Sequence, residues 1–159
     1  MKELYYPVAL KLKDKGVLVV GGGQVAERKV KTLLRFSARI RVVSPDLTVA
    51  LRRLAGLRRI VWLDRTVKAS DVERADLVIA ATSDRNLNRR IGRDASRKGI
   101  WVNVVDDTAA CDFISTAVIR KRGLVISIST GGKNPKLSKA FKDFLKGKLD
   151  EFDFNRDKS

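Results

Sequence analysis

A short glycine-rich segment, Gly21-x-Gly23-x-x-Ala26, is the part of the sequence with the clearest potential for ligand chemistry. In this spacing the first glycine makes a tight turn, the second lets the backbone approach a pyrophosphate, and the small third residue lets a helix pack closely on a strand. The pyrophosphate would then lie at the helix N-terminus, where backbone N–H groups and the helix dipole favour an anion. The segment predicts dinucleotide binding; the alternative is a turn with only a structural role.

The side chains available for catalysis are restricted. The chain of 159 residues has no histidine and one cysteine, Cys111. These absences exclude Ser-His-Asp and Cys-His catalysis, an intramolecular disulfide, and metal sites built on histidine or on several thiolates within one chain. Proton transfer would therefore fall to a carboxylate, a lysine, a tyrosine or water, and we expect no metal site. Cys111 is expected to pack as a small residue.

The charge predicts an anionic partner. There are 34 Lys and Arg residues against 18 Asp and Glu, a formal net charge of +16. A field of this size attracts anions. The partners left open by charge alone are a nucleic acid, an anionic membrane, and a small ligand with many carboxylates or phosphates. No apolar run approaches the roughly 20 residues of a membrane span, and the N-terminal residues lack a signal-peptide pattern, so we expect no membrane partner and a cytoplasmic location.

The elements that must position the glycine segment alternate between strands and helices. Residues 16–20 form a β-branched, apolar run, and residues 24–36 carry apolar side chains on one helix face and basic ones, including Lys29, on the other. A weak helix follows the second strand, and a helix with Leu87, Ile91 and Ala95 on one face precedes the fifth. Four further strands are expected at 39–44, 59–63, 76–81 and 100–105. This alternation predicts an α/β fold, a Rossmann-type doubly wound parallel sheet.

The pattern changes after Asp112. Residues 115–120 and 124–129 are expected to form a hairpin, and Asn134-Pro135 to begin a last helix whose apolar face carries Leu137, Phe141 and Leu145. We therefore expect a dinucleotide-binding domain over residues 1–112 and a smaller segment over residues 113–159.

The end of the second expected strand bears on the choice of dinucleotide. NAD enzymes often place an acidic residue there to bind the ribose hydroxyls. This chain has Ser44-Pro45-Asp46, so Ser44 and Asp46 could bind the ribose between them, which favours NAD. Arg39 and Arg41, earlier in the same strand, leave the 2′-phosphate of NADP possible.

Several segments, in this order, resemble the precorrin-2 dehydrogenase module that occurs alone or at the N-terminus of siroheme synthase. They are VVGGGQVAERK (19–29), NVVD (103–106), CDFI (111–114) and STGGKNPKL (129–137), and the resemblance extends to about Leu145. It implies NAD-dependent oxidation of precorrin-2, a tetrapyrrole with eight carboxylates, to sirohydrochlorin in siroheme and related porphyrin biosynthesis. It also implies a homodimer in which the segment after Asp112 interlocks with its partner and frames the substrate.

The resemblance assigns roles to individual residues. Asp106, at the end of NVVD, would be the catalytic residue that takes or relays the proton released when the substrate loses a hydride to NAD; the alternative is an aspartate that only caps the following turn. At the cofactor, the resemblance adds Gln24, Val25, Pro45, Asp46, Thr82 and Asn103 to Gly21 and Gly23 of the glycine segment and to Ser44. Those implied at the tetrapyrrole are Ser129, Thr130, Gly131 and Lys133.

Other activities stay open. Some members of the family also insert iron into sirohydrochlorin with the same aspartate; this chain stops soon after its last helix and has no histidine, so ferrochelatase activity is in doubt. A basic Rossmann-fold protein that binds nucleic acid would explain the charge but not the glycine segment. A nucleotide-sensing domain without chemistry usually carries an acidic residue where this chain has Ser44.

Overall fold

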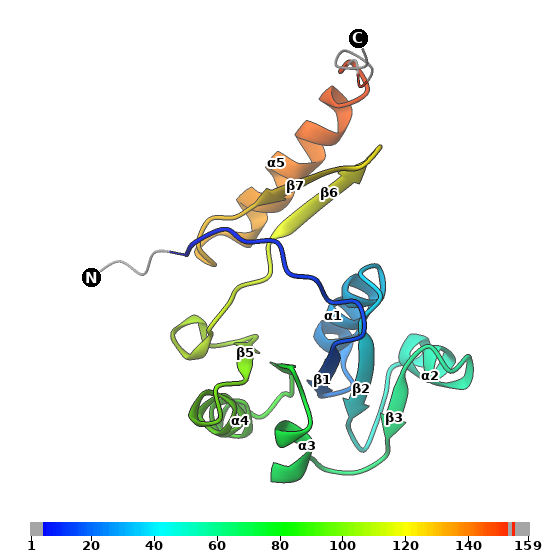
Figure 1. The fold of residues 1–159 in the computed structure, drawn as a ribbon, viewed down its shortest axis with the longest axis vertical. Coiled ribbons are helices and arrows are strands. Elements are labelled where there is room, and N and C mark those ends of the chain that lie inside the picture. The colour runs from blue at the N-terminus through cyan, green and yellow to red at the C-terminus, as the bar shows by residue number, and fades with distance from the viewer. Residues whose placement is uncertain (1–4, 153, 155–159) are drawn as a thin grey trace. The chain divides into compact units, whose positions relative to one another are not determined.

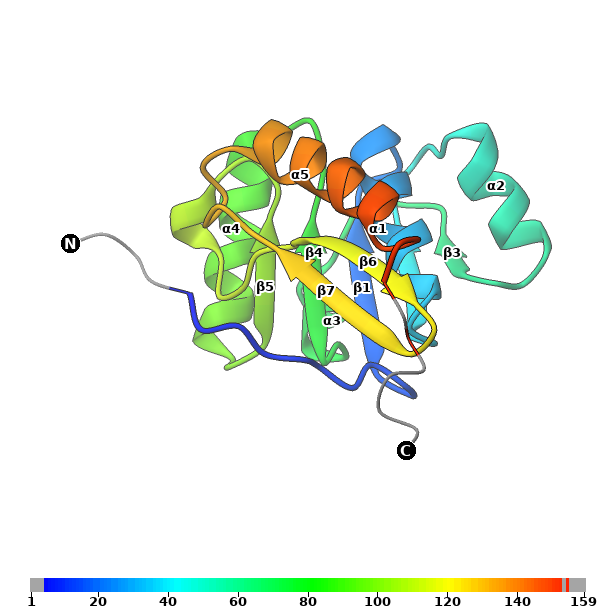
Figure 2. The same ribbon diagram turned by 90° about the horizontal axis from the view of Figure 1, so that it is seen from above.

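The computed structural model describes residues 5–152 and 154. The chain forms two compact units (Figures 1 and 2). We call residues 7–113 the sheet unit and the residues from Ile114 onward, together with Tyr5 and Tyr6, the hairpin unit. Within the described part of the chain, no helix is both long and apolar enough to cross a membrane.

The sheet unit contains one parallel sheet of five strands, in the order β3-β2-β1-β4-β5. The strands are β1 (Gly16–Val20), β2 (Arg39–Val43), β3 (Val61–Leu63), β4 (Leu77–Ala80) and β5 (Trp101–Val104). The helices are α1 (Gln24–Leu34), α2 (Val49–Gly56), α3 (Ala69–Glu73) and α4 (Arg85–Arg97), with a 3₁₀ turn η1 (Thr108–Ala110). The strand order reverses beside β1, and open α/β sheets bind ligands at the carboxyl edge of such a point. The predicted α/β Rossmann fold is confirmed.

The core explains why β1 reads as a continuous apolar run. Val17 and Val19 pack on one face of the sheet in the same cluster as Val30 of α1, whereas Leu18 lies in the cluster on the opposite face with Ile91 of α4. A parallel strand covered by helices on both faces has no solvent side, and its residues are therefore apolar throughout.

Two local differences from the sequence expectations have clear physical causes. The short helix α3 was not predicted; Asp71 stabilises its first turn by accepting a hydrogen bond from the Lys68 N–H and pairing with Arg65 through both carboxylate oxygens. The third strand begins at Val61 rather than at residue 59, because Arg58 takes a φ of +53° and the Arg59 N–H still bonds back to the Leu54 carbonyl at the end of α2.

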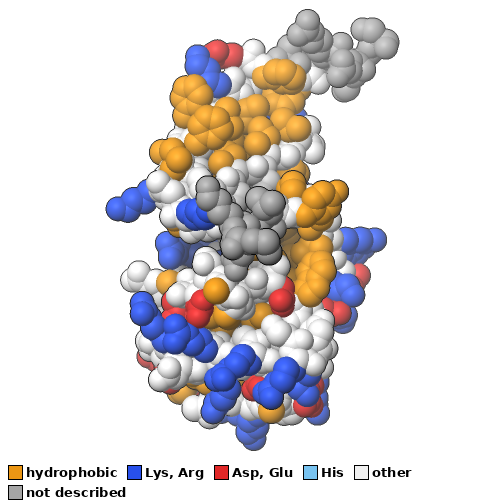
Figure 3. Space-filling view, turned by 90° about the vertical axis from the view of Figure 1, so that its left-hand side faces the viewer, with side chains coloured by type: hydrophobic (Ala, Val, Ile, Leu, Met, Phe, Trp, Pro, Cys, Tyr) orange, Lys and Arg blue, Asp and Glu red, His pale blue; other side chains and the backbone are white. Residues whose placement is uncertain are grey.

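The hairpin unit consists of antiparallel β6 (Ala117–Lys121) and β7 (Leu124–Ile128) and helix α5 (Pro135–Lys148). Asn134 caps α5 by accepting from the Leu137 N–H, as its position before Pro135 predicts. The unit has little core of its own, and Figure 3 shows hydrophobic side chains gathered on its surface. The large apolar side chains exposed there include Val125, Leu137, Phe141 and Phe144. The predicted apolar face of the last helix is thus largely uncovered in a single chain.

Candidate active site

The glycine segment joins β1 to α1, and its three glycines are needed for different reasons. Gly21 has a φ of +112°, and a Cβ placed on it would lie 2.3 Å from the Ala81 carbonyl oxygen. A Cβ on Gly22 would lie 1.8 Å from the Asp46 carbonyl oxygen. Both residues therefore let the segment pass close to the ends of the neighbouring strands. Gly22 was not among the predicted site residues, although its place between the two fingerprint glycines is the signal that could have identified it.

Gly23 faces open space instead. It is exposed, it is the N-cap of α1, and a Cβ placed on it would meet nothing within 4 Å. No side chain of the described residues caps this helix end, so the first N–H groups of α1, at Gln24 and Val25, lack an intrahelical acceptor. An open cradle with free donors at the positive end of a helix suits a pyrophosphate. The residues present therefore fit a dinucleotide.

The carboxyl end of β2 presents one carboxylate. Asp46 has a side chain that is 82% exposed, and its Oδ1 accepts from the Leu47 N–H and pairs with Arg52. The Arg52 guanidinium lies over the Trp62 ring, 5.5 Å from its centroid. Pro45 is exposed, whereas Ser44 is buried and its hydroxyl faces the Asp46 N–H at 3.4 Å. Asp46 is thus the more accessible of the two predicted ribose ligands.

Arg39 and Arg41 do not reach this end of the sheet. Arg39 donates to the Asp14 carbonyl, and Arg41 donates to the Arg74 carbonyl at 2.7 Å, next to the start of β4. Both guanidinium groups therefore lie toward the amino edge. The expectation that they could bind a 2′-phosphate is wrong.

Asp106 lies just beyond β5 and is held by a buried amide of α4. Asn88, with no exposed surface, donates through Nδ2 to Asp106 Oδ1 at 3.2 Å and to the Thr82 carbonyl at 3.0 Å. Its Oδ1 accepts from the Thr82 N–H and hydroxyl at 3.0 and 2.7 Å. The other oxygen of Asp106 lies 3.6 Å from Arg85 Nε. Thr82, just beyond β4, and Asp106 are therefore brought together by Asn88, a candidate site residue that the sequence analysis did not name.

The side chain of Asp106 does not serve the turn that follows it. In the part of the chain that the structure describes, its carboxylate contacts are to Asn88 and Arg85, both on α4. The side chain is 23% exposed, so one carboxylate is partly open to solvent at the ligand-binding edge of the sheet. This arrangement suits a group that exchanges a proton with a ligand.

Asn103 lies deeper than expected and is engaged by the protein. Its Oδ1 accepts from Lys29 Nζ at 2.9 Å, and its Nδ2 donates to the Phe113 carbonyl at 3.0 Å. Lys29 was expected on the solvent face of α1; it is half-buried, and burial lowers the pKa of its ammonium group. Burial raises the pKa of the nearby Cys111 thiol, whose sulfur contacts the backbone of Val104. Cys111 therefore behaves as a packed residue.

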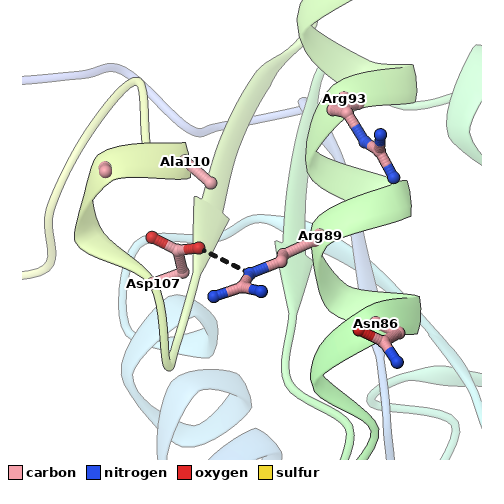
Figure 4. A pocket seen from close by; sticks show the side chains of 6 residues that line it. Asn86, Arg89, Arg93, Asp107 and Ala110 are labelled. Atoms are coloured by element: carbon pink, nitrogen blue, oxygen red, sulfur yellow. Dashed lines mark hydrogen bonds and ion pairs between the residues drawn. The ribbon is translucent and has the colours of Figure 1, made fainter.

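A hollow of about 600 Å³ lies between α4 and η1 (Figure 4). Arg89 donates from Nε to Asp107 Oδ2 at 3.0 Å, and Arg93, one turn further along the helix, also lines the hollow. Asn86, Ala109 and Ala110 complete the lining. Two guanidinium groups facing one hollow can bind a carboxylate or phosphate. Among the residues that the structure places, no group of three or more acidic or cysteine side chains could hold a metal ion.

The four residues predicted at the tetrapyrrole form the turn between β7 and α5 of the hairpin unit. Ser129 Oγ accepts from the Gly131 N–H at 3.0 Å, and Thr130 Oγ1 accepts from the Asn134 N–H at 2.9 Å. Gly131 has a φ of +64°, and Lys133 is exposed. The turn is ordered by its own hydrogen bonds, and its contact with a substrate stays a prediction.

Comparisons with known proteins agree with this reading of the sheet unit. Siroheme synthase 1 of Serratia proteamaculans is 39% identical over 145 residues, which are 91% of this chain and 30% of that protein. Siroheme synthase of Thioalkalivibrio sulfidiphilus is 40% identical over 93% of this chain. The chain thus spans about three-tenths of the length of these relatives. The solved structure described as "SirC, precorrin-2 dehydrogenase" superposes with a TM-score of 0.77 at 27% identity, covering 94% of this chain and 72% of that one.

The resemblance stated from the sequence motifs is therefore confirmed in sequence and in fold. Residues 8–117, which include all five strands of the sheet, match the family model described as "Putative NAD(P)-binding". That family also agrees with the predicted nicotinamide dinucleotide cofactor. The chain belongs to this NAD(P)-binding family.

Proposed function

We propose that the protein is a dehydrogenase that oxidises precorrin-2 to sirohydrochlorin with NAD. The observation that carries the proposal is the partly exposed Asp106 carboxylate, held by Asn88 at the same sheet edge as the open N-terminus of α1. The likeness to a precorrin-2 dehydrogenase over nearly the whole chain supports the choice of substrate.

The residues of the sheet unit divide the work of this reaction. The first turn of α1 binds the pyrophosphate with its N–H groups, and Asp46 accepts a hydrogen bond from a ribose hydroxyl. When bound, NAD supplies the hydride acceptor. The substrate loses one hydride and one proton, and Asp106 accepts or relays that proton. Arg85 Nε lies 3.6 Å from Asp106 Oδ2, on the side of the carboxylate opposite its contact with Asn88.

The net charge of +16 supports a substrate with many carboxylates. On the sheet unit, the hollow with Arg89 and Arg93 lies along the helix that also carries the Asp106 contacts. On the hairpin unit, Ser129, Thr130, Gly131 and Lys133 are the proposed tetrapyrrole contacts. Each guanidinium or ammonium group at a surface binds a carboxylate weakly, but several of them together bind a ligand with several carboxylates more tightly.

The proposal includes a homodimer and a cytoplasmic location. Val125, Leu137, Phe141 and Phe144 are each about half exposed or more, on a unit with little core. Exposed apolar side chains gathered on one unit are typical of an interaction surface. A second copy of the same chain is the partner that the resemblance implies.

The test is an anaerobic assay with enzymatically generated precorrin-2 and NAD, followed by the absorption of NADH and of sirohydrochlorin. We expect both to appear in equal amounts, and Asp106→Asn to abolish turnover while NADH binding, measured by fluorescence, is unchanged. Folded protein that binds NADH but gives no turnover would contradict the proposal. Steeply salt-dependent binding to random duplex DNA without NADH binding would favour the nucleic-acid alternative.

A further inference from the structure

We infer that Asn88 is the positioning residue of the active site: it holds the Asp106 carboxylate in the partly exposed position that the reaction uses. The inference rests on the proposed function. Nothing in the motifs or in the names of the relatives assigns a role to this residue.

The amide of Asn88 has only one possible orientation. Its two N–H groups donate to the Thr82 carbonyl and to Asp106 Oδ1, and its oxygen accepts from the Thr82 N–H and hydroxyl. Turning the amide over would set an NH₂ group against the Thr82 N–H and an oxygen against the carboxylate. The Thr82 N–H and carbonyl therefore fix the orientation of the amide, and in this orientation Asn88 donates to Asp106.

This fixed donor decides which oxygen of Asp106 is available. Oδ1 is engaged by Asn88, so Oδ2 is the oxygen that can receive a proton from the substrate. A neutral donor holds the carboxylate without neutralising its charge. The charged groups near it are Arg85 at Oδ2, Asp84, which caps α4 through the Asn86 and Leu87 N–H groups, and Asp107, which is paired with Arg89.

Packing alone does not explain an asparagine at this position. The buried face of α4 is formed by Asn88, Ile91, Gly92 and Ala95. Asparagine is a poor helix former, and burying its amide is costly unless every polar atom is satisfied. An apolar residue, as at Ile91, would fill the space without that cost. The amide is therefore retained for its contact with Thr82 and Asp106.

The experiment compares Asn88→Ala, Asn88→Asp and a matched control, Ser96→Ala, which removes an exposed hydroxyl from the far end of the same helix. We expect Asn88→Ala to lower kcat at least tenfold and to leave the Kd for NADH within twofold, and Ser96→Ala to change neither.

Asn88→Asp keeps the size of the side chain but sets a second carboxyl group against Asp106. Two carboxylates that share a site oppose each other's ionisation, so the acidic limb of the pH profile of kcat should move to higher pH. A residue with only a structural role would not move this limb. Because loss of a buried amide can also unfold the chain, circular dichroism melting accompanies each variant, and only variants folded at the assay temperature are compared.

Two outcomes separate the inference from the proposed function. If Asp106→Asn is inactive while folded Asn88→Ala and Asn88→Asp keep the kcat and pH profile of the unaltered chain, the positioning role is wrong and the proposed reaction stands. If the unaltered chain binds NADH but does not oxidise precorrin-2, the proposed function fails, and the inference fails with it.

Discussion

Replacing two adjacent glycines by alanine should have opposite consequences. A Cβ on Gly22 would lie 1.8 Å from the Asp46 carbonyl oxygen and 2.8 Å from a Leu47 methyl group, so Gly22→Ala must push the β1 turn away from the end of β2. Overpacking of this kind costs about 1–3 kcal/mol. At roughly 2–4 °C per kcal/mol for a chain of this size, the Tm should fall by roughly 2–12 °C.

Gly23→Ala should instead spare the fold and damage binding. The backbone at Gly23 has a φ of −81°, which alanine adopts freely, and the new methyl group would meet no protein atom within 4 Å. Its cost to stability is at most about 1 kcal/mol, from the weaker N-cap preference of alanine. The methyl group would occupy the space assigned to the pyrophosphate. We expect the Kd for NADH to rise at least tenfold, about 1.4 kcal/mol of binding free energy.

The assays are thermal melting by circular dichroism and titration of NADH fluorescence, on both variants and the unaltered chain. Unchanged NADH binding by Gly23→Ala would refute the placement of the pyrophosphate at the N-terminus of α1. An unchanged Tm for Gly22→Ala would contradict the steric contact expected between a Cβ on Gly22 and the end of β2.

Three further predictions concern other parts of the molecule. Arg65 holds the pKa of Asp71 at about 2, below its usual 3.8. The ionised carboxylate therefore stabilises the fold by about 2 kcal/mol above pH 4, and this stabilisation is lost as the pH falls from 4 toward 2. Asp71→Asn should lower the Tm at pH 7 and flatten its fall between pH 5 and 2; an equally steep fall would contradict the assignment. Asp46→Asn should release Arg52 to bind the 2′-phosphate of NADPH, so the ratio of the Kd for NADPH to the Kd for NADH should fall at least fivefold. An unchanged ratio would show that the Asp46–Arg52 pair does not determine the selectivity between NADH and NADPH. Phe141→Asp should convert a dimer to a monomer in sedimentation velocity, and a dimer that survives would place the interface elsewhere.

The sheet could be predicted because its strands are buried on both faces. When a glycine turn and an amphipathic helix follow an apolar, β-branched run such as β1, the pattern strongly predicts a buried strand. Helix α3 could not be predicted, because its five residues are too few to show a helical period. Its first turn depends on the contact of Asp71 with Arg65, six residues earlier, and helical spacing does not reveal such a pair.

The candidate site could be predicted where its residues act through the backbone or lie at a strand end. The glycine turn is of this kind, whereas the role of Asp106 was implied by the family resemblance and stays a prediction. Asn88 could not be predicted, because a polar residue on a helix is assigned to solvent, and its partner Asp106 lies 18 residues away. The expected apolar face of α4 began at Leu87, which is only half-buried, whereas Asn88 is completely buried. Lys29 illustrates the same limit, since its amine turns inward to Asn103.

Because the first turn of α1 is uncapped, hydrogen exchange of its N–H groups should report whether a dinucleotide is bound. Backbone N–H groups without an acceptor, such as those of Gln24 and Val25, exchange with deuterium quickly, whereas those of the adjoining β1 strand are protected by the sheet. A pyrophosphate bound to the turn would accept from these groups and slow their exchange. Deuterium uptake across residues 21–26, measured by mass spectrometry, would therefore follow dinucleotide binding without a chromophore, a tetrapyrrole or turnover.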